Sequence, residues 1–204
     1  MIFIGITGGI GSGKSTVCLL FEKKGIPIFY ADSVAKNIVD SDSAALQEII
    51  DLFGERILDS SKKLNRKILA EIVFNDVELL DKLNKIVHPK VFDAFEQWRV
   101  KYSPKGSYAI VESAVLFESG LFELLDYALA VLADENERIK RVSARDSVQA
   151  EQVIARMKHQ ISVEELLELS DFQIQNNGTI DDLTSKVNFF HSLFSTLTPS
   201  KEIE

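Results

Sequence analysis

The stretch "GGIGSGKST" (residues 8–16) decides the fold that we predict for this sequence. The apolar run "IFIGI" (2–6) before it is typical of a strand that is buried on both faces. The segment "KSTVCLLFEKKG" (14–25) has apolar residues at helical spacing and ends on a glycine, which predicts a helix. Between the strand and the helix, the sequence matches the pattern G-x-x-x-x-G-K-[ST] of a phosphate-binding P-loop.

The chemistry of such a loop depends on its glycines, its lysine and its hydroxyl groups. Glycine has no Cβ, so backbone N–H groups can point inward around an anion. Lys14 can reach the β- and γ-phosphates of a nucleotide, and the Ser15 hydroxyl can bind Mg²⁺. A glycine-rich turn without a ligand is the alternative, but the flanking strand and helix argue against it. The residues predicted to bind the phosphates are Gly8, Gly9, Gly11, Ser12, Gly13, Lys14, Ser15 and Thr16.

Predicted strands and helices alternate along the rest of the chain. Apolar runs predict further strands at 26–30, 107–112, 127–133 and 171–175. Charged or amphipathic patterns predict helices at 134–146, 147–162 and 181–197. This alternation indicates an α/β fold with a mostly parallel sheet, whose ligands bind at the carboxyl ends of the strands.

Residues 33–103 differ from their surroundings, because helical spacing occurs there with almost no strand signal. Pro89 is expected to start the last helix of this region, "HPKVFDAFEQWRVKYSP" (88–104). His88 directly before it is a lone histidine, which is more often structural than catalytic. We therefore predict one domain with three parts. The sheet core comprises 1–32, 104–134 and 171–204, the helical insert comprises 33–103, and the helical lid comprises 135–170.

Composition limits the classes of protein to consider. Of the 204 residues, 46% are hydrophobic, enough for one domain with a sizeable core. The net charge of −8 disfavours nucleic-acid binding, because an acidic surface repels a phosphate backbone. The single cysteine, Cys18, excludes an internal disulfide and suits a reducing cytosol. Without a signal peptide or an apolar run of roughly 20 residues, we expect a cytoplasmic protein with no membrane partner.

A P-loop does not show which molecule receives the phosphoryl group. The guanine-binding motif N-K-x-D is absent, and "DLFG" (51–54) lies in a helical pattern, which argues against a GTPase switch. Asp32 follows the second predicted strand, so a parallel sheet would bring it beside the P-loop. Its carboxylate either accepts the proton of an acceptor hydroxyl or caps the helix that follows. The residues alone leave both roles open.

Other charged residues allow two interpretations each. Glu112 ends a predicted strand, where it is either a carboxylate beside a metal ion or a solvated one. Arg138, Arg141 and Arg145 share one helix face, where they either bind phosphoryl oxygens or pair with nearby glutamates. The order of the predicted elements favours phosphoryl binding by these arginines.

Short segments along the whole chain, up to about residue 195, resemble dephospho-CoA kinases in their order and spacing. They are "TGGIGSGKST" (7–16), "ADSVAK" (31–36), "NKIVHPKV" (84–91), "VLFESG" (115–120), "RIKRVSARD" (138–146) and "DFQIQNNG" (171–178). The P-loop is shared with many families. The aspartate after the second strand, the His-Pro pair and the Leu-Phe-Glu triplet are more specific in combination.

The resemblance implies a P-loop kinase with five parallel strands, a helical acceptor lobe and a lid. It implies transfer of the γ-phosphoryl group of ATP to the ribose 3′-hydroxyl of dephospho-CoA, the last step of CoA synthesis. Asp32 would be the catalytic base, acting with Lys14 and Arg141, and Ser15 and Glu112 would bind Mg²⁺. The remaining implied residues are Arg145, Asn176 and Gly178 for ATP, and Asp32, Lys36, His88, Leu116, Phe117 and Glu118 for the acceptor. We expect a monomer or a weak homo-oligomer.

The sequence departs from the family pattern at several positions. Glu112 stands where aspartate is usual, and Arg138 where glutamine is common. Leu166 replaces a usual lysine and Ser170 a usual alanine. None of these changes touches the P-loop or Asp32. Another small-molecule P-loop kinase, for nucleoside monophosphates or a sugar acid, and a non-kinase P-loop ATPase are the alternatives.

Overall fold

A computed structural model of the chain describes residues 1–74, 76–103 and 106–199. The chain divides into two compact units, one formed by Met1–Tyr30 with Val100–Glu204 and the other by Ala31–Arg99. The first unit contains the β-sheet, and the second is mostly helical. The boundaries of the second unit lie close to those predicted for the helical insert.

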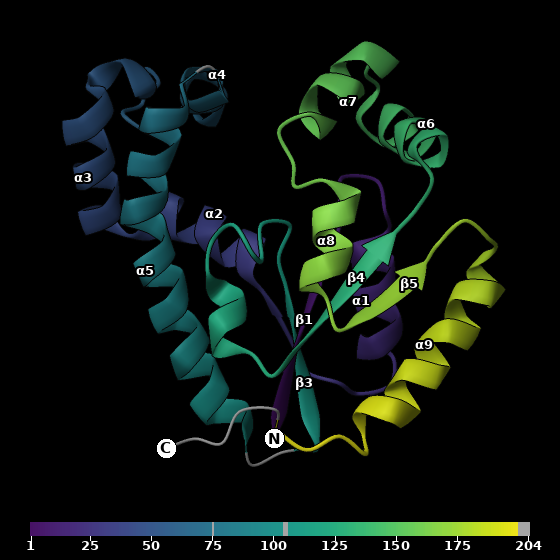
Figure 1. The fold of residues 1–204 in the computed structure, drawn as a ribbon. Coiled ribbons are helices and arrows are strands. Elements are labelled where there is room, and N and C mark those ends of the chain that lie inside the picture. Colours follow the sequence, from purple (N-terminus) through teal and green to yellow (C-terminus); the bar gives the residue numbers. More distant parts are fainter. Residues whose placement is uncertain (75, 104–105, 200–204) are drawn as a thin grey trace. The chain divides into compact units, whose positions relative to one another are not determined.

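Five parallel strands form the sheet of the first unit, in the order β2-β3-β1-β4-β5. The strands are β1 (Ile2–Thr7), β2 (Ile28–Tyr30), β3 (Tyr108–Glu112), β4 (Tyr127–Leu132) and β5 (Phe172–Gln175). Because all pairings are parallel, the carboxyl ends of the strands meet at one edge (Figure 1). The prediction of a five-stranded parallel sheet flanked by helices is confirmed.

Helices cover both faces of this sheet. They are α1 (Lys14–Glu22), α6 (Glu135–Asp146), α7 (Ala150–Met157), α8 (Val163–Leu169) and α9 (Ile180–Phe194), with a short 3₁₀ helix η3 (Leu121–Leu124). Figure 1 shows α1 and α9 on one face and α8 on the other. The strands have both faces buried, which explains why their sequences are continuous apolar runs rather than alternating ones.

One apolar cluster joins α1 and α9 to the sheet. At its centre Tyr108 packs edge to face on Phe21 and Phe194, with ring centroids 6.3 and 5.6 Å apart. The buried Tyr108 hydroxyl forms a 2.7 Å hydrogen bond with Nδ1 of His191, so its polar end is satisfied. This packing fixes α1, and with it the loop that precedes α1, on the edge of the sheet.

The second unit consists of α2 (Ala31–Ser41), α3 (Ser43–Phe53), η1 (Glu55–Ile57), α4 (Arg66–Phe74) and most of α5 (Val77–Tyr102). Asp42 caps α3, because its carboxylate accepts hydrogen bonds from the backbone N–H groups of Ala44 and Ala45 at 2.9 and 3.0 Å. Buried apolar side chains of its helices give the unit its core; they include Ala45, Ile49, Phe53, Ile57, Leu69, Val73, Val87, Val91 and Phe95.

The prediction that a helix begins at Pro89 is wrong. The structure has one continuous helix, α5, with Pro89 in its interior. A proline there removes one backbone hydrogen bond and crowds the carbonyl four residues earlier. Val87, Val91 and Phe95 are buried at intervals of one helical turn on both sides of the proline. Packing of this apolar stripe therefore outweighs the local cost of the proline.

Among the described residues, none of the helices combines the length and the hydropathy that crossing a membrane requires.

Candidate functional site

The glycine loop follows β1 directly and leads into α1. Gly8 and Gly13 have φ values of +148° and +100°, a conformation that residues with a side chain rarely adopt. A Cβ on Gly8 would lie 2.2 Å from the carbonyl oxygen of Val131, and one on Gly13 would lie 2.2 Å from Nδ2 of Asn176. The loop therefore needs glycine at both positions for its backbone to lie against β4 and the chain after β5.

Lys14 and the hydroxyls of the loop lie at the start of α1. The Lys14 ammonium donates a 2.6 Å hydrogen bond to the carbonyl oxygen of Gly8, so the lysine folds back over the loop. Ser15 is exposed in the first turn of the helix. The Ser12 hydroxyl is buried and has no hydrogen-bond partner among the residues that the structure describes. A fixed cation, polar hydroxyls and a helix N-terminus together suit an anion.

A cavity of about 200 Å³ opens beside this loop. It is lined by Gly13, Thr16, Arg141, Asn176, Gly178, Thr179, Ile180 and Leu183. The structure thus brings Gly13 and Thr16 of the P-loop together with Asn176 and Gly178 after β5, all of which were predicted to bind ATP, and with Arg141 of α6, which was predicted to be catalytic. Three further residues that line the cavity were not predicted, because none belongs to a motif that the sequence shows: Thr179, Ile180 and Leu183.

Asn176 holds this cavity together through three hydrogen bonds. Its backbone N–H donates to the carbonyl oxygen of Leu132 at 2.7 Å, which extends the β4–β5 pairing by one residue. Its side-chain amide donates to the carbonyl oxygen of Ser12 at 2.8 Å. Its own carbonyl oxygen accepts from Nη2 of Arg141 at 2.9 Å. Asn176 therefore connects the P-loop with α6.

Arg141 lines the cavity and has a hydrogen-bond donor without a partner in the described part of the chain. Its Nη1 atom is buried and has no hydrogen-bond partner among the described residues. Glu137 lies 3.9 Å from its Nη2 atom, a distance at which the ion pair is weak and partly solvated. A buried donor without a partner is costly unless a ligand satisfies it. Arg141 is therefore suited to bind an anion in this cavity.

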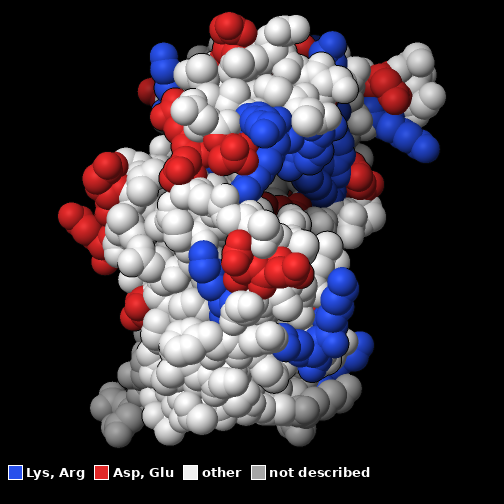
Figure 2. Space-filling view, turned by 90° about the vertical axis from the view of Figure 1, so that its right-hand side faces the viewer, with Lys and Arg blue, Asp and Glu red and all other residues white. Residues whose placement is uncertain are grey.

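Arg145 is not brought to the cavity. Its side chain is 63% exposed and pairs with Asp146 at 2.7 Å, and Arg156 pairs with the same carboxylate at 3.1 Å. The two guanidinium groups hold the pKa of Asp146 below its usual value, with Arg145 as the larger cause. In Figure 2, Lys and Arg side chains gather in the upper part of the view, at the same height as α6 and α7 in Figure 1.

Glu112 ends β3 and is 7% exposed. Ile6 of β1 lies beside it in the sheet, one residue before the end of that strand. Burial raises the pKa of the Cys18 thiol, and the charge of Glu112 raises it further. Glu112 is therefore a buried carboxyl group close to Cys18 of α1. Three or more side chains that could hold a metal ion between them are not found together in the described part of the chain.

The triplet at 116–118 follows β3. Leu116 is fully buried, and its Cδ2 atom occupies the space that a side chain on Gly5 would fill. Phe117 packs against Phe122, with ring centroids 5.3 Å apart. Only Glu118 of the three is exposed. Leu116 thus packs in the core of its unit, and a role of this triplet in acceptor binding stays a prediction.

The other predicted acceptor residues belong to the second unit. Asp32 lies in the first turn of α2, which begins at Ala31, so Asp32 does not precede the helix as a cap residue would. The backbone carbonyl of Lys36 accepts a hydrogen bond from Arg66. His88 is half-buried and stacks on Phe92, and burial lowers its pKa.

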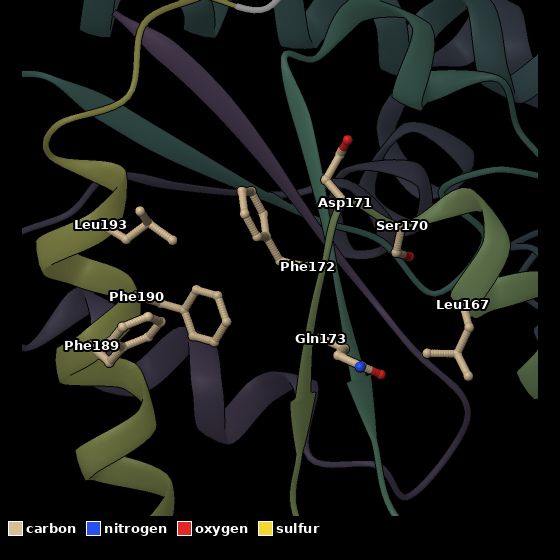
Figure 3. Close-up of a pocket in the computed structure, with 8 residues that line it drawn as sticks. All are labelled: Leu167, Ser170, Asp171, Phe172, Gln173, Phe189, Phe190 and Leu193. Atoms are coloured by element: carbon tan, nitrogen blue, oxygen red, sulfur yellow. The ribbon is translucent and has the colours of Figure 1, made fainter.

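A second cavity of about 600 Å³ lies between α8, β5 and α9 (Figure 3). Its lining residues are Leu167, Ser170, Asp171, Phe172, Gln173, Phe189, Phe190 and Leu193. None of the residues that the sequence predicted for a site lies in it. The P-loop, Glu112, Asn176 and Gly178 instead lie at or just after the carboxyl ends of their strands.

The family model and the relatives found by sequence name one family. The family model for dephospho-CoA kinase matches residues 2–182. A dephospho-CoA kinase of Salinibacter ruber is 46% identical over 187 residues, which cover 91% of this chain and 94% of the relative. A crystal structure of the Thermus thermophilus protein TT1252 has a TM-score of 0.83 at 31% identity and covers 97% of this chain and 98% of its own. A dephospho-CoA kinase from Campylobacter jejuni has a TM-score of 0.69 at 30% identity, with 95% and 96% covered.

Proposed function

The chain belongs to the dephospho-CoA kinase family, and from this premise we propose how its residues transfer a phosphoryl group from ATP to dephospho-CoA. We propose the ribose 3′-hydroxyl of dephospho-CoA as the acceptor and CoA and ADP as the products. The observation that carries the proposal is the meeting of the P-loop, Arg141 and Asn176 around one cavity.

In this proposal, the P-loop and the cavity beside it hold ATP. The backbone N–H groups of the loop and the start of α1 bind the β- and γ-phosphates. Lys14 exchanges its hydrogen bond with the Gly8 carbonyl for the phosphate oxygens, so a positive charge is already in place. Asn176 and Gly178 line the part of the cavity that receives the adenine.

Mg²⁺ fits the donors that the chain offers. Magnesium prefers oxygen ligands and usually binds through one or two side chains, with phosphates and water completing its shell. The Ser15 hydroxyl and the buried Glu112 carboxylate are two such oxygen donors. A magnesium ion bound to both would not require a third protein ligand. The ion would neutralise charge that develops on the phosphates during transfer.

Phosphoryl transfer needs an oriented acceptor and stabilised charge, and it requires little covalent chemistry from the protein. We assign the acceptor proton to the Asp32 carboxylate, which follows β2 in the chain by two residues. Arg141 donates its unpaired Nη1–H to the transferring phosphoryl group. The second unit, with Lys36 and His88, and the triplet with Glu118 bind the acceptor.

A coupled assay tests the proposed function. Purified protein receives ATP and Mg²⁺ with dephospho-CoA, a nucleoside monophosphate, a sugar acid or no acceptor, and ADP release is followed. We expect ADP release only with dephospho-CoA, together with one equivalent of CoA. Release at the same rate without an acceptor would identify an ATPase, and turnover with another acceptor would identify a different small-molecule kinase.

A further inference from the structure

Two side chains outside the P-loop hold both backbone groups of Ile10, at the tip of the loop. The Ile10 N–H donates a 2.8 Å hydrogen bond to Oε1 of Gln160. The Ile10 carbonyl oxygen accepts a 3.0 Å hydrogen bond from Nε of Arg138. Nη2 of Arg138 lies 3.4 Å from the same Gln160 oxygen, so the three residues form a closed ring of contacts.

The loop is shaped to receive this arginine. A Cβ on Gly9 would lie 2.2 Å from Nη2 of Arg138, so the guanidinium occupies the space that a side chain at this position would need. A Cβ on Gly11 would lie 2.6 Å from the backbone carbonyl oxygen of Arg138 and 2.9 Å from Val142. The P-loop pattern requires glycine at neither position. Here both glycines make room for α6.

We call the grip of Arg138 and Gln160 on Ile10 the clamp, and it also places a positive charge beside the loop. Arg138 is 9% exposed, and both hydrogen bonds of its guanidinium described above go to uncharged oxygens. Burying a cation is costly unless its surroundings compensate for the lost water. A loop that binds a polyanion provides such compensation when the nucleotide is bound.

Arg138 and Gln160 come from different parts of the first unit. Arg138 is in the first turn of α6, where its backbone N–H donates to the carbonyl of Asp134. Gln160 follows α7, in a turn closed by its N–H on the carbonyl of Met157. The two helices pack on each other, so the clamp connects the tip of the P-loop to the pair α6–α7 as a whole.

We propose that Arg138 and Gln160 are positioning residues for the nucleotide, which hold Ile10 so that the P-loop is arranged for phosphates before they bind. They act through the backbone of the loop and do not contact the reacting atoms. A loop held in its binding conformation loses less freedom on binding, so its affinity for phosphates is higher. The inference rests on the proposed function only in that the loop binds the phosphates of ATP.

Direct titration of ADP tests the clamp. We expect Arg138→Met and Gln160→Leu each to weaken ADP binding about tenfold, the scale of one lost hydrogen bond. The double variant should be about as weak as the weaker single one, because each substitution breaks the same ring. We expect kcat at saturating substrates to stay within about twofold, since only uniform binding is lost.

Three further variants make the result decisive. Lys140→Met removes a charge from an exposed position of α6 and should leave ADP affinity unchanged. Lys14→Ala should abolish measurable ADP binding, which confirms that the P-loop is the site titrated. Arg138→Lys keeps the charge but lacks the planar fork, so it should stay weakened several-fold.

Three outcomes would overturn the proposal. In the first, the single variants bind ADP as tightly as the wild type and only their Tm is lowered. In the second, the losses of ADP affinity in the two single variants multiply in the double variant. In the third, Arg138→Lys binds ADP as tightly as the wild type. If the wild-type protein binds ADP but does not phosphorylate dephospho-CoA, the proposed function fails while the titration still decides the clamp.

Discussion

Single residues of this chain combine a structural contact with a predicted chemical role, and Asp32 is the clearest example. In the sequence it is either a base or a helix cap. The structure begins α2 one residue earlier, so the carboxylate lies within the first turn. A first-turn carboxylate still interacts favourably with the helix dipole. A substitution that keeps the shape and removes only the charge can separate the roles.

Asp32→Asn should lower kcat by about 10²–10⁴-fold, the usual contribution of a general base. ADP affinity should stay unchanged, because the amide keeps the size of the side chain and the P-loop is intact. The measurement is steady-state kinetics with saturating dephospho-CoA, together with an ADP titration. Asp40→Asn is the matched control, since Asp40 lies in the same helix and pairs with Arg66 on the surface. If Asp32→Asn retains kcat within twofold, the carboxylate is not the base.

Arg141→Ala should lower kcat and kcat/KM together by about 10²-fold, because the lost donor acts on charge that develops in the transition state. Arg145→Ala should change kcat much less, since Arg145 is exposed and paired with Asp146. Both variants are compared at saturating dephospho-CoA. A rise in the KM for ATP with unchanged kcat in Arg141→Ala would show that the arginine holds only the ground state.

The chemistry of the P-loop could be predicted from the sequence because its pattern is local. Gly8, Gly13 and Lys14 lie within seven consecutive residues, so one short segment of sequence contains the whole pattern. The hydrogen bond of Asn176 to Ser12 and the clamp of Arg138 on Ile10 join segments more than 120 residues apart in the chain. Spacing alone placed Arg138 on one face with Arg141. It could not show that the guanidinium turns toward Gly9.

At the scale of elements, α5 shows where local rules fail. Proline indicates a helix boundary from sequence, because it lacks an N–H and crowds the preceding turn. The buried stripe of Val87, Val91 and Phe95 continues across Pro89 at helical spacing, and burial of each such side chain contributes about 1.5–3 kcal/mol. Packing energy that depends on the rest of the unit cannot be read from the proline itself.

Pro89→Ala should raise the Tm, because alanine restores the backbone hydrogen bond and removes the clash inside α5. We expect a gain of about 2–2.6 kcal/mol, which is the helix penalty of proline, about 3 kcal/mol, less the roughly 0.4–1 kcal/mol that proline contributes by restricting the unfolded chain. Thermal unfolding followed by circular dichroism measures the change.

Pro27→Ala is the control, since Pro27 precedes β2 outside any helix and its carbonyl accepts from Ile110. It should lower the stability by about 0.4–1 kcal/mol through the unfolded state alone. A lower Tm for Pro89→Ala would mean that the packing of the unit requires the distortion that proline introduces.

At the scale of the whole molecule, the two units have separate cores. The unit with the sheet contains the P-loop, Arg141 and Asn176, and the helical unit contains Asp32, Lys36 and His88. In the proposed function, ATP therefore binds to the first unit and the second unit contributes to the acceptor site. This division can be followed by hydrogen exchange, because a ligand slows local opening of the region that it binds.

We expect ADP to slow amide exchange in the P-loop and at 176–183, and dephospho-CoA added afterwards to slow exchange within 31–99. Saturation with ADP first is needed, because the adenosine part of dephospho-CoA can itself enter the nucleotide cavity. Exchange is measured by mass spectrometry of peptides from each unit. If dephospho-CoA protects only peptides of the first unit in the presence of ADP, the helical unit is not the acceptor lobe.

Cys18, the only thiol in the chain, is fully buried on the face of α1 that packs on the sheet. Burial and the neighbouring Glu112 raise its pKa, so the folded protein contains little of the reactive thiolate. A chromogenic disulfide reagent can therefore attack only after the first unit has opened. The rate at which colour appears therefore measures the opening of the first unit, and the measurement needs no introduced label. ADP binds the folded first unit and not the opened one, so it should slow the modification of Cys18. The extent to which the rate falls reports how fully the nucleotide site is occupied.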